Sequence, residues 1–228
     1  MGLICLGPLL QADLMATYDG QVTVSDASES GGACAVATGL TWSGRSLVGL
    51  RNDLRLAPLD RPLLVISLFN GIGGAFRLYD ILGIIPAGRI SVDISRTGNR
   101  VSRSAWPDMI ELHDVELIDL KEIERWAGLF PHVVEVHMFA GFPCVHLSSA
   151  RAFRRNLEGE GSRLFWKLLE VIQWVQQVFS VQAKVKWCVE NVASMDEAAR
   201  QTISSELEVS PIKLDPSDVL PYSRPRFA

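Results

Sequence analysis

The chain has 228 residues, of which 48% are hydrophobic and 21% charged, and its formal net charge at pH 7 is −4. These values are typical of a globular domain with an appendage, and they exclude a disordered or low-complexity chain. No apolar run reaches the roughly eighteen residues of a membrane span, and the four cysteines form no disulfide framework or metal-ligand spacing, so we expect an intracellular protein without a metal site.

The first sixty residues form an appendage to the rest of the chain. Residues 21–28 and 31–37 have the pattern of two strands joined by a tight turn, which predicts a β-hairpin. The segment resembles the opening hairpin of ribonuclease H-like domains in retroelement polyproteins, where an aspartate at the place of Asp26 binds a metal. One carboxylate cannot assemble a two-metal site, so a plain hairpin is the favoured structure.

Residues 61–228 alternate between strand and helix patterns. This alternation predicts an α/β fold in which a mostly parallel sheet carries helices on both faces. Residues 162–180 show the clearest helical stripe of apolar residues. We expect strands near 63–69, 89–93, 111–114, 134–139 and 185–189, and helices near 74–82, 98–105, 119–128, 162–180 and 195–208.

The first of these strands ends in a glycine turn. Residues 69–74 read Phe-Asn-Gly-Ile-Gly-Gly, directly after a buried-strand composition and before a helical pattern. Glycines at such a turn let the backbone approach a ligand and aim helix amides at its polar groups. The spacing is not that of a dinucleotide-binding loop, and the turn alone is a weak signal.

The fourth strand ends in Gly141-Phe142-Pro143-Cys144. The glycine lets the backbone turn and the proline restricts φ, so the cysteine is held at the carboxyl edge of the sheet. A thiolate is the strongest nucleophile among ordinary side chains, and a rigid loop presents it well. Taken alone, this motif fits a buried structural cysteine equally well.

Two further segments carry charged groups. The fifth strand ends in Glu190-Asn191, although Glu190 also fits a helix N-terminal charge beside a Ser194–Glu197 capping box. Near the end of the sequence, Arg224 and Arg226 flank a proline, which alone is typical of a solvated basic turn.

Together and in this order, these segments resemble the C5-cytosine DNA methyltransferase family over residues 61–228. The resemblance implies a Rossmann-like S-adenosylmethionine-dependent methyltransferase fold, which transfers a methyl group to C5 of a flipped cytosine in DNA. It implies that Cys144 adds to C6, that Glu190 serves N3, and that Arg226 holds O2 with Arg224 in support. Covalent addition activates the otherwise unreactive C5, and the base must leave the helix stack first.

The same resemblance implies where S-adenosylmethionine binds. Asp93, which ends the second strand, takes the place of a family glutamate on the ribose hydroxyls, and Asp114 that of the acceptor for the adenine amino group. Asp114 also fits a strand-end helix cap. The implied cofactor-binding residues are Phe69, Gly71, Gly73, Asp93, Asp114 and Pro143.

A basic cluster, Arg151, Arg154, Arg155 and Arg163, follows the cysteine. Because the net charge is negative, contacts to DNA phosphates need such local clusters. An ordinary exposed loop explains the cluster equally well.

The sequence departs from the family pattern after Arg226. Family members continue into a target-recognition region, which the residues up to Ala228 do not contain. We therefore expect weak or absent activity in this chain unless a protein partner supplies DNA contacts, and a nuclear location in a eukaryote. Two alternatives remain: an inactive interaction module with the same fold, and an RNA (tRNA) cytosine-C5 methyltransferase.

Overall fold

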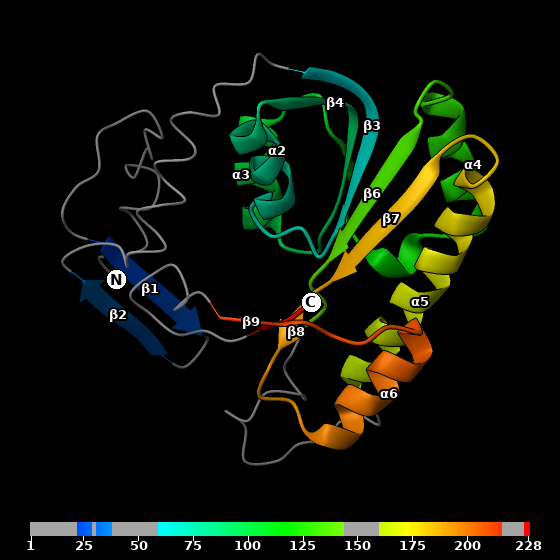
Figure 1. Ribbon diagram of the computed structural model, residues 1–228. Helices are drawn as coiled ribbons and strands as arrows, with labels where there is room; N and C mark the ends of the chain where they lie inside the picture. Colours follow the sequence, from blue (N-terminus) through cyan, green and yellow to red (C-terminus); the bar gives the residue numbers. More distant parts are fainter. Residues whose placement is uncertain (1–21, 29–30, 38–58, 144–159, 216–225) are drawn as a thin grey trace. The chain divides into compact units, whose positions relative to one another are not determined.

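The computed structural model describes residues 22–28, 31–37, 59–143, 160–215 and 226–228 (Figure 1). The chain divides into two compact units, Met1–Leu50 with Pro216–Ser223, and Arg51–Asp215 with Arg224–Ala228. In the first unit, β1 (Val22–Ser28) pairs antiparallel with β2 (Gly31–Ala37). These strands lie where the sequence predicts a hairpin, while the ribonuclease H-like resemblance stays a prediction.

The second unit is built on a five-stranded parallel sheet. Its order is β5-β4-β3-β6-β7, and every neighbouring pair is parallel. The central strand β3 buries both of its faces, as its unbroken apolar run from Leu63 to Ile66 requires. The strands are β3 (Leu59–Leu68), β4 (Ile84–Val92), β5 (Ile110–Leu112), β6 (Glu135–Ala140) and β7 (Lys184–Val189).

Helices cover both faces of this sheet (Figure 1). The smaller of two buried clusters joins β3 to α2 through Phe76 and Tyr79, and the larger one includes Trp126 of α4 and Phe165 of α5. Among the described residues, no helix combines the length and apolarity needed to cross a bilayer. The helices are α2 (Gly74–Leu82), α3 (Arg96–Ala105), the 3-10 helix η2 (Val115–Leu117), α4 (Leu120–Leu129), α5 (Glu160–Phe179) and α6 (Glu197–Leu207).

The fold class predicted from the sequence is confirmed, and two local features differ. Helix α6 begins after Asp196, whose carboxylate accepts a hydrogen bond from the Ala199 amide at 2.7 Å. The predicted Ser194–Glu197 capping box is therefore wrong, because Asp196 directly precedes the first helical turn and caps it. A small antiparallel sheet, β8 (Asn191–Val192), β10 (Arg226–Phe227) and β9 (Lys213–Leu214), was not predicted, because two-residue strands carry no periodicity.

A chain of polar side chains crosses the interface between α2 and the sheet. The Tyr79 hydroxyl lies 2.7 Å from His137 Nδ1, and His137 Nε2 lies 2.9 Å from Glu135 Oε2. Tyr79 is only 4% exposed. Burial, with a smaller contribution from the Glu135 charge, raises the pKa of Tyr79 to about 12.

We expect this burial to make folding sensitive to alkali. An unfolded tyrosine ionises near pH 10.0, whereas folded Tyr79 stays protonated to about pH 12. The contribution of protonated Tyr79 to the free energy of unfolding is therefore complete below pH 10. It decreases by about 2–3 kcal/mol as the pH rises towards 12. Urea unfolding at pH 9 and 11.5 should show this loss in the wild type and a smaller one in Tyr79→Phe. An equal loss in both proteins would contradict it.

Candidate functional site

The five parallel strands end at one level. Their register pairs Leu68 with both Val92 and Ala140, Val92 with Leu112, and Ala140 with Val189. The loops that follow the strands therefore leave from one edge of the sheet, which is where α/β folds bind ligands. The first residues of these loops are Phe69, Asp93, His113, Gly141 and Glu190.

The glycine turn after β3 has a backbone that few other sequences can adopt. Phe69, Gly71 and Gly73 all have left-handed φ angles, of 55°, 57° and 91°. A Cβ atom on Gly73 would lie 2.2 Å from the Trp106 ring, so this position has no space for a side chain. Gly73 caps α2 without any side-chain hydrogen bond. The first amides of α2 are therefore not occupied by a side-chain cap and suit a polar ligand group.

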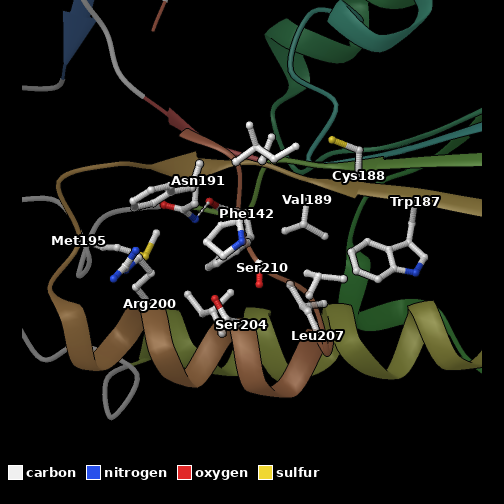
Figure 2. A pocket seen from close by; sticks show the side chains of 16 residues that line it. Phe142, Trp187, Cys188, Val189, Asn191, Met195, Arg200, Ser204, Leu207 and Ser210 are labelled. Carbon is white, nitrogen blue, oxygen red and sulfur yellow. Dashed lines mark hydrogen bonds between the residues drawn. The ribbon is translucent and has the colours of Figure 1, made fainter. Parts of the chain in front are cut away.

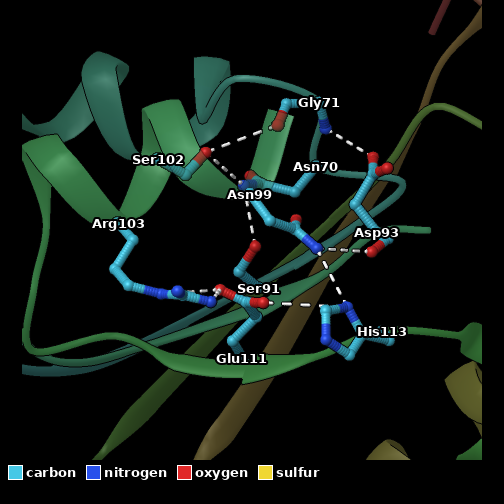
Figure 3. Close-up of polar contacts among 9 residues, drawn as sticks. All are labelled: Asn70, Gly71, Ser91, Asp93, Asn99, Ser102, Arg103, Glu111 and His113. Atoms are coloured by element: carbon cyan, nitrogen blue, oxygen red, sulfur yellow. Dashed lines mark hydrogen bonds and ion pairs between the residues drawn. The ribbon is translucent and has the colours of Figure 1, made fainter. Parts of the chain in front are cut away.

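Asp93 ties this turn to the end of β4 (Figure 3). Its Oδ2 atom accepts a hydrogen bond from the Gly71 amide at 2.6 Å, and its Oδ1 atom accepts one from the Ser95 amide at 2.6 Å. The Asp93 amide donates to the Leu112 carbonyl at 3.1 Å. Each carboxylate oxygen has a second lone-pair site, so Asp93 can still accept hydrogen bonds from hydroxyl groups of a ligand.

Asp114 lies one residue further from its strand. It caps η2, and its Oδ1 atom accepts a hydrogen bond from the Glu116 amide at 3.0 Å. This is the helix-cap geometry that the sequence also allowed. Its Oδ2 atom makes no hydrogen bond within the described residues. A role in binding adenine stays a prediction.

Three exposed apolar side chains lie in the loops after β3, β4 and β5, and we did not single them out in the sequence. Ile72, Ile94 and Leu117 are 66%, 77% and 66% exposed. Ile72 and Ile94 are isolated apolar residues in short segments at strand ends, which is the signal that identifies them, whereas Leu117 is the last residue of η2. Together they supply apolar surface to the edge that carries Asp93, as a flat ring system in a ligand requires.

The other half of the edge brings Glu190 and Arg226 together. Arg226 Nε lies 2.5 Å from Glu190 Oε1, and the two side chains are 24% and 46% exposed. The Glu190 amide donates to the Ala140 carbonyl at 2.8 Å. A Cβ atom on Gly141 would lie 3.2 Å from Glu190 Oε2, so the carboxylate lies against the start of the loop that leads to the cysteine.

Asn191 holds that loop in place, a role not predicted from the sequence. It is 6% exposed, and its Nδ2 atom donates to the Phe142 carbonyl at 3.0 Å. Its Oδ1 atom accepts from the Val192 amide at 2.8 Å. Pro143 is exposed at the end of this loop, whereas Cys144 and Arg224 lie outside the described residues.

Two other side chains near the edge have defined environments. Cys188 is exposed at the surface, but the packing around its thiol, with a smaller contribution from the Glu190 charge, raises its pKa. Arg163, expected in a phosphate-binding cluster, pairs with Glu116, with Nε 2.6 Å from Oε1 and Nη2 2.9 Å from Oε2. The Arg163 side chain is 74% exposed, and exposed ion pairs are weak, so its role in phosphate binding stays a prediction. The other three arginines of the cluster lie outside the described residues.

A separate pocket of about 280 Å³ lies between the sheet and α6 (Figure 2). Its walls are mainly apolar and include Trp187, Val189, Leu207 and Phe227. Of the predicted site residues that the structure describes, none lines it. The sequence did not predict this pocket, because its walls come from segments that meet only in the folded chain.

The five-stranded parallel sheet with helices on both faces is a Rossmann-like fold of the kind found in methyltransferases. A crystal structure of a DNMT2 mutant from Spodoptera frugiperda superposes with a TM-score of 0.50 at 21% sequence identity, covering 72% of this chain and 48% of that one. Because its identity is low, this likeness concerns the fold alone. No protein-family model matches the chain.

Curated plant proteins named as DNA (cytosine-5)-methyltransferases are homologous to this chain. DRM1A of Oryza sativa subsp. japonica is 29% identical over 64% of the chain, and DRM2 of the same species is 35% identical over 51%. DRM1 of Arabidopsis thaliana is 32% identical over 50%. The aligned parts of these relatives are 33%, 20% and 19% of their lengths, so the chain spans a third of them or less.

The geometry of the glycine turn predicts an order of destabilisation for single alanine substitutions. Gly73→Ala should destabilise the protein most, lowering the free energy of unfolding by more than about 2 kcal/mol, because its Cβ overlaps the Trp106 ring and its φ is 91°. Gly71→Ala has open space but a left-handed φ, and should cost about 1 kcal/mol. Gly74→Ala is the matched control: it has open space and should be neutral or stabilising. Urea unfolding measures all three, and a Gly73→Ala protein as stable as Gly74→Ala would contradict this geometry.

Proposed function

We propose that residues 61–228 form the catalytic part of a DNA (cytosine-5)-methyltransferase. One observation carries the proposal: the strand register brings the glycine turn, the Asp93 carboxylate and the Glu190–Arg226 pair to a single edge. The names of the homologous plant proteins support the reaction class.

The first half of the edge fits S-adenosylmethionine, which supplies the methyl group when bound. The left-handed backbone at Gly71 and Gly73 and the uncapped start of α2 provide amides for polar groups of the ligand. Asp93 accepts hydrogen bonds from the ribose hydroxyls, and exposed Ile94 beside it offers apolar surface to the base. Phe69, Asp114 and Pro143 complete the proposed set.

The second half fits the chemistry of cytosine. The Cys144 thiolate adds to C6, and the electron pair released into the ring makes C5 nucleophilic while Glu190 supports N3 by hydrogen bonding or proton transfer. When C5 takes the methyl group, S-adenosylhomocysteine is the leaving group. The C5 proton then leaves to water, the C6–Sγ bond breaks, and the Cys144 thiolate is regenerated.

The Glu190–Arg226 contact suits adjacent atoms of the base. In cytosine, the N3 atom and the carbonyl O2 lie side by side on one edge, so they need one carboxyl and one donor side by side. Arg226 Nε and Glu190 Oε1 at 2.5 Å meet that requirement before a base arrives. Preorganised groups of this kind stabilise developing charge without reorganisation during the reaction. Arg224 is proposed to support them.

DNA is the proposed partner, and the target base leaves the stack to reach the site. Because the net charge is −4, phosphate contacts depend on local clusters of arginines. The direct test is transfer of a tritiated methyl group from S-adenosylmethionine to duplex DNA and, in parallel, to tRNA. Labelling of DNA alone supports the proposal, and labelling of tRNA alone favours the RNA alternative. Labelling of neither, with no covalent trapping on 5-fluorocytosine DNA either, favours the interaction module.

We expect Cys144 to be the only cysteine that becomes bonded to the base. Duplex DNA containing 5-fluorocytosine should trap the wild type as a covalent complex on a denaturing gel, because fluorine at C5 cannot leave as a proton does. Cys144→Ser should abolish trapping. Cys188→Ser is the matched control and should trap normally, because it leaves Cys144 intact. Trapping by Cys144→Ser would contradict the assignment.

Glu190→Gln and Arg226→Leu should each reduce methyl transfer about 100-fold, as loss of a group that stabilises charge in the transition state does. Both side chains lie at the half of the edge away from Asp93, so affinity for S-adenosylmethionine should change less than about threefold. Single-turnover rates and calorimetric binding separate the two effects. A variant that loses cofactor binding in proportion to its rate would show that the residue serves the cofactor instead.

A further inference from the structure

Asn99 is a buried amide on α3 that contacts two of the loops at the carboxyl edge (Figure 3). It is 2% exposed, and its Nδ2 atom donates to the Asp93 backbone carbonyl at 2.8 Å. The same Nδ2 atom lies 3.3 Å from Nδ1 of His113, the residue before Asp114. One amide group therefore joins the end of β4 to the end of β5.

We propose that Asn99 is a positioning residue for the cofactor site: it fixes the Asp93 backbone and, through it, the carboxylate that meets the ligand. This inference rests on the proposed function for the identity of the ligand. The hydrogen bond from Asn99 completes a set that holds Asp93 on all sides, since the Asp93 amide and both carboxylate oxygens are already bonded to backbone groups. Asn99 would thus act through Asp93 and not by touching the cofactor.

The amide is not explained by stability alone. The Asn99 Oδ1 atom is buried and has no hydrogen-bond partner within the described residues. Burying an acceptor in this way costs free energy that an apolar side chain at the same place would avoid. The two N–H groups of Asn99 are therefore the functional part of the side chain, and both point to loops of the proposed cofactor site.

The same helix holds the glycine turn through a second, separate set of contacts. Asn70 Nδ2 donates to Ser91 Oγ at 2.8 Å and to Ser102 Oγ at 3.1 Å, and Ser102 Oγ donates to the Gly71 carbonyl at 3.4 Å. A Cβ atom on Gly98 would lie 2.5 Å from the Gly71 carbonyl oxygen, so α3 lies directly against the turn. Ser102, which does not contact Asp93, is therefore a matched control for Asn99.

His113 completes this link at the end of β5. Its Nδ1 atom lies 3.3 Å from Asn99 Nδ2 and 3.7 Å from Glu111 Oε1. The other oxygen of that carboxylate, Glu111 Oε2, binds Arg103 of α3.

The positioning itself can be tested without a ligand. Hydrogen exchange measured by NMR reports on the Gly71 and Ser95 amides, the two donors to the Asp93 carboxylate. In Asn99→Ala and Asn99→Asp, the Ser95 amide should exchange at least about tenfold faster, since Asp93 is less restrained. In Ser102→Ala, Gly71 should exchange faster while Ser95 stays within about twofold of the wild type. Unchanged Ser95 exchange in both Asn99 variants would overturn the proposal.

Calorimetric binding of S-adenosylmethionine tests the functional consequence. Asn99→Ala should raise Kd about tenfold at pH 8, and His113→Ala about threefold without loss of thermal stability, because the His113 side chain is 67% exposed. Wild-type affinity in both Asn99→Ala and His113→Ala would overturn the inference. Absence of binding by the wild type would contradict the proposed function and leave the exchange result to decide the positioning role.

Discussion

The Asp93 carboxylate accepts hydrogen bonds from two backbone amides that belong to different loops, Gly71 after β3 and Ser95 after β4. Hydrogen bonds to a charged group contribute more than neutral ones, at about 1.5–3 kcal/mol each. These bonds explain why the glycine turn keeps left-handed angles that are unfavourable in isolation. The close approach of α3, which Gly98 permits, secures the same turn from its other side.

A different constraint organises the second half of the edge. Glu190 and Arg226 are far apart in sequence, and they meet because β10 pairs with β8 directly after Glu190. Asn191, in that short strand, also binds the Phe142 carbonyl and so fixes the loop that leads to Cys144. One small antiparallel sheet thus aligns the Glu190 carboxylate, the Arg226 guanidinium and the loop that leads to Cys144, whereas the proposed cofactor half depends on backbone amides and one carboxylate.

The two halves differ in how far the sequence predicted them. The strands of the parallel sheet and the α-helices of the second unit were predicted to within a few residues, apart from the longer β3 and β4, because buried strands and amphipathic helices leave periodic apolar patterns. The glycine turn and the residues at strand ends were predicted for the same reason. The contacts of polar surface groups were not predicted. Arg163 pairs with Glu116, and Asp196, not Ser194, caps α6. Such contacts depend on which side chains meet in space, and local pattern does not encode that.

The sequence alone determined the α/β class, the order of its elements and the chemistry available at each strand end, because these follow from local periodicity and from residue type. The tertiary structure decided which of those groups meet. Parallel register aligned five strand ends, the Glu190–Arg226 pair formed through a sheet of two-residue strands, and Asn99 became a link between two loops. Each of these depends on contacts between residues distant in the chain, whose geometry is set only when the whole core packs.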